Sequence, residues 1–249
     1  MSSCPRFKKT EHWLLAITGL LGLWSVGALA GLKTMPTQFE AMGGQLNARS
    51  EQIEAQDREG RSAKIASRYS LGVSTQLNFR VQFLPLFVSY GLQKSEFESA
   101  ARTTVQQQGQ YRHSLNVGIS PSMWIFQLRL SGGFEQAYFA RRLSQSALSL
   151  EKAWVPRLTA ILDLPIPLSS DLLHGSQIDV GVSARWAALF KGFPRAIQSN
   201  GGEQIGGGAF VRYNGFKFNV NYTRERHSSQ LTHQYNKILE CMVSFNGEF

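Results

Sequence analysis

Residues 203–226, EQIGGGAFVRYNGFKFNVNYTRER, decide the fold. Asn214-Gly215 separates two runs of alternating character, and Asn-Gly readily adopts the positive φ angles of a two-residue hairpin turn. One face of the predicted hairpin carries Gly207, Ala209, Val211, Tyr213, Phe216, Phe218, Val220 and Tyr222. The other face carries Gly206, Gly208, Phe210, Arg212, Lys217, Asn219, Asn221 and Thr223. We therefore expect a β-hairpin with one apolar face, aromatic near the turn, and one mostly polar face.

The same alternation recurs along the chain. Apolar and polar residues alternate over 69–80, 111–119, 124–131, 154–164, 177–186 and 235–245. The mean hydropathy is only −0.19, as expected when lipid-facing residues alternate with lumen-facing ones. The pattern predicts an all-β fold, a closed antiparallel up-and-down transmembrane β-barrel over residues 67–249.

The strand count depends on residues 68–93. There the apolar residues occupy odd-numbered positions up to Phe79 and even-numbered positions from Leu84 onward, on either side of the break near Pro85. One long strand bent by a bulge gives eight strands. Two strands with a turn near 80–85 give nine, and a tenth would then come from residues 31–66. Single-chain bacterial barrels have even strand numbers, so we predict eight, with ten as the alternative.

The N-terminus has the pattern of an export signal. Arg6, Lys8 and Lys9 precede an apolar run over 13–29, and Ala28-Leu29-Ala30 fits a signal-peptidase site. We predict a signal peptide over 1–30, cleaved after Ala30, with an uncleaved membrane anchor as the alternative. Residues 31–66 include the charged stretch SEQIEAQDREGR and few β-branched residues, which predicts a helical or disordered periplasmic leader.

The charge limits the expected binding partners, and the cysteine content limits the possible disulfides. The formal net charge is +9, yet an exported chain rarely meets nucleic acid, so a phosphorylated lipid or an anionic solute is the expected partner. Cys4 would leave with the signal peptide. Cys241 would then be the single cysteine, and no intramolecular disulfide is expected.

These features together resemble the small outer-membrane β-barrel proteins of Gram-negative bacteria over about residues 68–249. The resemblance depends on the signal peptide, the period-2 strands, the terminal Phe249 and the aromatics Trp124, Trp154, Trp186, Tyr213 and Tyr222. It implies a bacterial outer-membrane location, and recognition of the strand ending in Phe249 by the barrel-assembly machinery. Gly247 departs from this pattern, because an aromatic residue is usual there. A soluble lipocalin-like barrel, with its apolar face inside, is the competing interpretation.

An apolar face turned to lipid directs the opposite face into the lumen. The predicted lumen charge network comprises Arg112, Arg129, Arg157, Arg185, Arg212, Lys217, Asp163, Asp179 and Glu240. Charges in a narrow lumen must pair, because their desolvation is expensive. We expect Arg212 and Lys217 to form salt bridges with Asp163 and Asp179 near the periplasmic end. The predicted role is structural or surface-interaction, with a side-chain-packed lumen. The alternative is a narrow, porin-like pore that prefers anions, because inward bases outnumber inward acids.

The remaining polar residues suggest surface contacts more than chemistry. Loop bases Arg141, Arg142, Lys191 and Arg195 are expected to face lipopolysaccharide phosphates. Glu225, His227, Ser228 and His233 lie close in sequence near an outer loop, but nucleophilic catalysis needs a third orienting group. We therefore predict that the protein is not an enzyme, a lipid-active enzyme being the least favoured alternative. No metal-site spacing is present, and no cofactor is expected.

Overall fold

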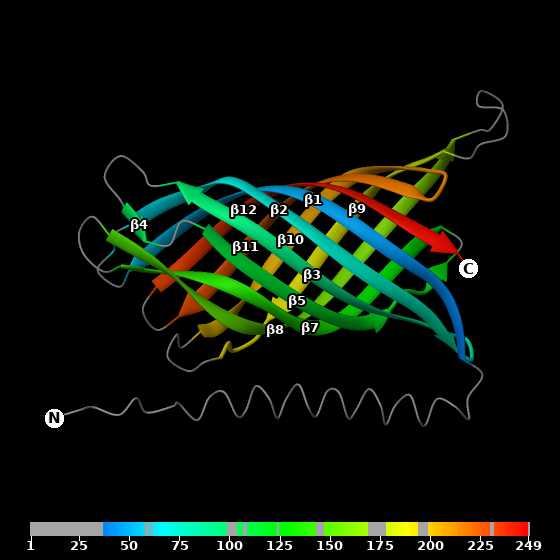
Figure 1. Cartoon of the computed structure of the whole chain (residues 1–249), viewed down its shortest axis with the longest axis horizontal. Helices are drawn as coiled ribbons and strands as arrows, with labels where there is room; N and C mark the ends of the chain where they lie inside the picture. Colours follow the sequence, from blue (N-terminus) through cyan, green and yellow to red (C-terminus); the bar gives the residue numbers. More distant parts are fainter. Residues whose placement is uncertain are drawn as a thin grey trace.

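The computed structural model describes residues 37–57, 60, 62–98, 104–106, 109–123, 125–142, 147–168, 178–193, 199–229 and 232–248 (Figure 1). The predicted signal peptide, its cleavage site and Phe249 lie outside the described residues. Within the described part of the chain, no helix is long and apolar enough to cross a membrane.

Ten strands form a closed ring. They are β1 (Thr37–Asp57), β2 (Ser62–Val81), β3 (Leu84–Glu98), β5 (Gly109–Ile119), β7 (Phe126–Arg142), β8 (Ala147–Leu168), β9 (Ile178–Leu189), β10 (Ser199–Tyr213), β11 (Phe216–Ser229) and β12 (Thr232–Glu248). Each of these strands is antiparallel to its neighbours, and the pairing of β12 with β1 completes the ring. Two short strands lie beside it: β4 (Thr104–Gln106) pairs in parallel with β8, and β6 (Ser122–Met123) pairs with β7.

The prediction of eight strands is wrong, and the alternative of ten is confirmed. Residues 68–93 form two strands, because β2 turns at Gln82 and Phe83, with Gln82 at φ 57°, and pairs with β3 from Val81↔Leu84 onward. The shift of the apolar residues from odd to even positions near Pro85 therefore marks a turn and not a bulge.

The tenth strand is β1, which corrects the predicted helical or disordered leader over 31–66. Residues 41–57 pair with β12 along their whole length, and β1 also pairs with β2. The outward side chains Ser50, Gln52 and Gln56 are polar and exposed, so this half of β1 lacks the apolar alternation of a lipid-facing strand. Backbone pairing on both sides specifies the strand instead.

The hairpin around Asn214-Gly215 forms as predicted. Asn214 and Gly215 have φ values of 45° and 80°, and the register places Tyr213 opposite Phe216 and Val211 opposite Phe218. The barrel end that carries this turn, the Gln82–Phe83 turn and the end of β12 is called the hairpin end below. It lies at the right of Figure 1, near the C mark. The opposite end is called the loop end.

Most large apolar side chains of the strands point outward. Leu46, Leu71 and Val220 are 62%, 57% and 50% exposed, whereas the neighbouring Asn219, Asn221 and Thr223 are buried in the lumen. This is the arrangement of a transmembrane barrel, and it is opposite to that of a lipocalin. Toward the loop end the outward residues become charged: on β11, Val220 and Tyr222 are followed by Arg224 and Arg226.

Candidate functional site in the lumen

The loop-end half of the β7–β8 hairpin leaves the barrel wall. β7 pairs with β5 only as far as Glu135, and β8 pairs with β9 only as far as Arg157, yet β7 and β8 stay paired to Arg142↔Leu148. Beyond Glu135, β7 is released from β5 and is buried on both faces, because residues 137–140 are all less than 9% exposed. On β8, Trp154 still bridges Phe193, and residues 147–149 pair with β4.

The ribbon reaches the opposite wall through Gln234. β12 stands five strands from β7 in either direction around the ring, so the two are diametrically opposed. The Gln234 side chain accepts a hydrogen bond from Ala140 N (3.0 Å) and donates one to Tyr138 O (2.8 Å). A side chain from one wall thus satisfies backbone groups of β7 that β5 no longer pairs.

An apolar layer fills the space around the ribbon. Its buried members are Ile53, Ala55, Ile65, Phe97, Tyr138, Ala140 and Leu150. The rings of Phe97 and Tyr138 meet edge to face, with centroids 5.5 Å apart. Among the described residues, these side chains fill the lumen around the ribbon at the loop end.

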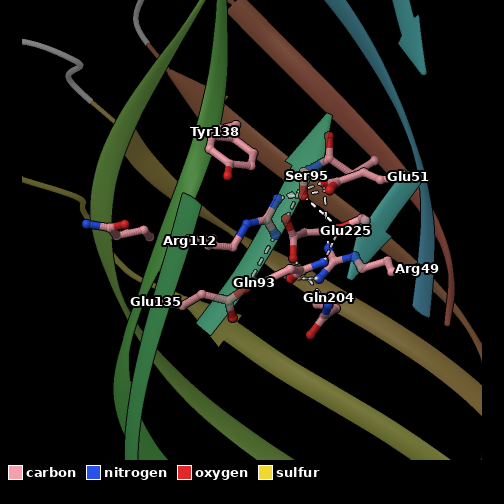
Figure 2. Close-up of polar contacts among 12 residues, drawn as sticks. Arg49, Glu51, Gln93, Ser95, Arg112, Glu135, Tyr138, Gln204 and Glu225 are labelled. Carbon is pink, nitrogen blue, oxygen red and sulfur yellow. Dashed lines mark hydrogen bonds and ion pairs between the residues drawn. The ribbon is translucent and has the colours of Figure 1, made fainter. Parts of the chain in front are cut away.

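A charged layer lies beside this apolar layer, centred on Arg112 (Figure 2). The Arg112 Nη2 atom donates to Glu51 Oε2 at 2.9 Å, and Nη1 lies 3.5 Å from Glu135 Oε1. The guanidinium carbon of Arg112 lies 4.4 Å from the Tyr138 ring centroid, and Glu135 also pairs with Arg157. The Glu51 side chain is fully buried, so the layer combines paired charges with one cation–π contact.

A second carboxylate, Glu225, organises the amides of this layer. It accepts hydrogen bonds from Asn236 Nδ2 (3.0 Å) and Gln204 Nε2 (3.2 Å), and it pairs with His227. The His227 ring packs on Phe139, with centroids 5.2 Å apart. Glu225 and His227 therefore belong to the lumen packing and not to an outer loop. The Ser228 hydroxyl donates to Gly201 O and does not meet His227.

Near the hairpin end, the four residues Arg212, Lys217, Asp163 and Asp179 form two ion pairs. Arg212 Nη1 lies 3.4 Å from Asp179 Oδ2, and Lys217 pairs with Asp163. Arg212 also donates to Gln127 Oε1 at 2.9 Å. The Lys217 Nζ atom lies 4.2 Å from the centroid of the Phe210 ring, a cation–π distance.

All nine residues of the predicted charge network face the lumen, but they do not form one cluster. Arg112 and Arg157 belong to the layer with Glu135, whereas Arg212 and Lys217 pair at the hairpin end. The remaining Arg129, Arg185 and Glu240 make no salt bridge within 4.0 Å to any described residue.

The sequence reasoning missed the lumen residues Arg49, Glu51, Glu135, Gln204, Glu225 and Gln234. Arg49 and Glu51 lie in the stretch assigned to the leader. The alternation of β11 could have found Glu225, because Thr223 is on the same face two residues earlier.

The predicted loop bases are only partly described. Lys191 is exposed, the side chains of Arg141 and Arg142 lie outside the described part, and so does Arg195. Outward bases on the strands themselves were not predicted as a group. Lys64 and Lys237 flank Glu54 at 3.1 and 3.3 Å, and Arg224 lies opposite Lys237 in the register of β11 and β12.

No protein-family model matches the sequence, and no curated protein matches it. Solved structures with a similar course of the chain are membrane barrels. The β-domain of the Bordetella autotransporter BrkA is 11% identical, with a TM-score of 0.42, covering 81% of this chain and 98% of that one. An outer-membrane channel from Pseudomonas putida F1 is 10% identical, with a TM-score of 0.43 and coverages of 84% and 96%. The outer-membrane protease OmpT from Escherichia coli is 7% identical, with a TM-score of 0.41 and coverages of 86% and 99%.

The activities in those names belong to those proteins. What decides the architecture here is the closed antiparallel ring, which pairs its own backbone and turns apolar side chains outward and charged ones inward. The fold is that of an outer-membrane β-barrel. Among the residues that the structure describes, no group of three His, Cys, Asp or Glu side chains is placed to hold a metal ion.

Proposed function

We propose that this outer-membrane barrel has a closed lumen and acts structurally and through its outer surface. The observation that carries the proposal is the contact of the β7–β8 ribbon with β12 through Gln234, backed by the apolar layer of Tyr138 and Phe97. An open pore needs a continuous aqueous path, and these buried side chains interrupt it at the loop end.

Strand length and connections support one orientation in the membrane. A transmembrane strand needs about 9–11 residues, whereas β1 has 21 and β12 has 17. The strands therefore extend beyond the apolar band. Several outward bases, Lys64, Arg224 and Lys237 among them, are at the loop end, and Arg80 pairs with Glu40 at the hairpin end. Outer-membrane barrels keep short turns in the periplasm, so the hairpin end faces the periplasm in this proposal. Assembly through the last strand, ending in Phe249, fits the same orientation.

The outward bases support a contact with phosphorylated lipid. Lys64 and Lys237 flank Glu54, just beyond the apolar residue Leu239. On the neighbouring strand β11, Arg224 lies opposite Lys237 and Arg226 lies opposite Tyr235. Arg224 and Arg226 each lie 5.7 Å from a tyrosine ring centroid, those of Tyr222 and Tyr235. Bases held beside the outer leaflet attract lipopolysaccharide phosphates as salt-screened charges.

The lipid contact is tested by lipopolysaccharide that copurifies with the barrel. We expect Arg224→Ala/Arg226→Ala to lower the bound amount several-fold, and Glu54→Gln, which removes a negative charge, to retain or raise it. Equal amounts in all three proteins would remove the lipid role from this surface.

Conductance in planar bilayers tests the closed lumen. We expect a flat trace from the folded wild-type barrel. Regular unit steps with anion selectivity would instead establish the second candidate, a narrow anion pore, which the seven lumen bases favour. Heat-modifiable gel migration of the same sample shows that the protein tested is folded.

We also propose that Glu225 and His227 serve packing and not catalysis. His227 is 1% exposed beneath Phe139, and its Nε2 atom is engaged by Glu225. Hydrolysis of labelled phospholipid by the wild type that is lost in His227→Ala would contradict this.

A further inference from the structure

A chamber of about 510 Å³ occupies the part of the lumen that the loop-end layer does not fill. Its lining runs from Gly215 at the hairpin turn to Arg112 and Glu135 of the charged layer, and it includes none of the apolar residues Ile53, Phe97 and Tyr138. Among the described residues the chamber is therefore blind at the loop end, and its lining extends to the hairpin turn. Its volume lies within the range of small-molecule sites, roughly 300–1,000 Å³.

Two arginines in the middle of the chamber have no carboxylate within salt-bridge distance. Arg129 of β7 and Arg185 of β9 both lie opposite Ile161 of β8, so they flank it on the lumen side of the wall. Neither makes a salt bridge within 4.0 Å to any described residue. The Cζ atom of the Arg129 guanidinium lies 5.4 Å from the centroid of the Phe87 ring.

Donor atoms at this depth are left without acceptors. The Nε atoms of Arg185 and Arg49 are buried and find no hydrogen-bond partner among the described residues. The Arg49 side chain is only 9% exposed, and its nearest carboxylate oxygen, in Glu51, is 3.6 Å away. An unsatisfied buried donor on a charged group is expensive, so this region requires water or an anion.

Each of the other bases that line the chamber has a carboxylate oxygen within 4.0 Å. Arg112 and Arg157 pair with Glu51 and Glu135, and each base at the hairpin end has its own aspartate. The chamber lining contains seven Arg and Lys residues against three carboxylates, Glu135, Asp163 and Glu240. Glu51, Asp179 and Glu225 lie behind the lining, so six carboxylates in all face the seven bases. Arg129 and Arg185 are the bases with no carboxylate within 4.0 Å, and Asp163 and Glu240 attract them from a longer distance.

We propose that this chamber binds a small oxyanion, of the phosphate or sulfate class, between Arg129 and Arg185. Guanidinium groups match the oxygens of such anions with paired N–H donors, and these charge-assisted bonds are stronger than neutral ones. Arg49 supplies a further donor from the side of β1. Because the chamber is blind, the anion enters and leaves through the hairpin end and is held in the lumen without crossing it.

The test is calorimetric titration of the folded barrel in detergent with inorganic phosphate, at constant ionic strength with chloride as the background anion. We expect saturable binding by the wild type and at least tenfold weaker binding by Arg129→Gln/Arg185→Gln. The matched control Arg68→Gln/Arg80→Gln removes two exposed bases that have no part in the proposed lipid contact, and it keeps the wild-type affinity. Loss of binding only in this control would assign the phosphate to the outer surface and overturn the proposal.

Ile161→Trp provides a second variant that retains every charge and fills the space between the two arginines. It should also abolish phosphate binding, while the barrel keeps its heat-modifiable migration. Wild-type protein that binds phosphate no more tightly than chloride would overturn the proposal, and so would either lumen variant with unchanged affinity. Neither result depends on whether the barrel conducts, so the chamber and the closed lumen are tested separately.

Discussion

At the scale of single residues, the lumen depends on how each buried charge is matched. Glu51 illustrates this best, since its carboxylate is fully buried. Its two oxygens accept hydrogen bonds from Arg112 Nη2, at 2.9 Å to Oε2 and 3.2 Å to Oε1. Sequence reasoning placed Arg112 in the lumen through the alternation of β5. It could not find Glu51, because the partner lies 61 residues away in a stretch without apolar periodicity.

We predict that Glu51→Gln destabilises the folded barrel by about 3–5 kcal/mol, because removing one partner of a buried pair leaves the other charge uncompensated. The free energy of unfolding is measured by urea titration in lipid vesicles. Glu54→Gln, on the outer face of the same strand, serves as the control and should change it little. Equal effects of the two substitutions would contradict the role of the Arg112 layer.

At the scale of elements, the β10–β11 and β7–β8 hairpins are specified by different kinds of contact: local ones in the first and long-range ones in the second. The β10–β11 hairpin could be predicted to the register from Asn214-Gly215 and the alternation around it. The inward fold of the β7–β8 ribbon could not, because it depends on Gln234 across the lumen and on where β5 and β9 stop pairing. Local sequence fixes a turn, but it carries no signal for contact with the opposite wall.

We predict that Gln234→Leu loosens the ribbon, since Tyr138 O and Ala140 N then lose their partner from β12. The expected cost is about 1–3 kcal/mol for the unsatisfied backbone groups. Brief conducting events should appear in planar bilayers where the wild type is silent. Gln76→Leu is the matched control, because Gln76 bonds only to Asn78 on its own strand and lines the chamber. A silent Gln234→Leu barrel of wild-type stability would contradict the ribbon's role as a closure.

At the scale of the whole molecule, ring closure explains why the tenth strand is needed. β12 and β2 are both antiparallel to β1, so they run parallel to each other. Without β1, closure of the ring would need a parallel pair. The alternation of the other strands pointed to a barrel, but the polar outward face of β1 concealed the strand that closes it.

Deletion of residues 37–57 should therefore prevent closure. We expect the deleted chain to lose heat-modifiable migration and to remain sensitive to protease in outer-membrane fractions. A compact, heat-modifiable nine-strand product would show that β1 is dispensable.

The central claim is that the apolar face meets lipid while the arginines face the lumen, and Cys241 tests it most directly. Its side chain is exposed on the outer face of β12 between Leu239 and Val243, and it is the free cysteine of the described residues. A nitroxide attached to Cys241 in vesicles should collide readily with oxygen dissolved in the lipid and rarely with a water-soluble nickel chelate. A label at the next residue, Met242→Cys in a Cys241→Ala background, faces the lumen and should lose that preference for oxygen. Nickel accessibility at Cys241 equal to or above that at residue 242 would contradict the account.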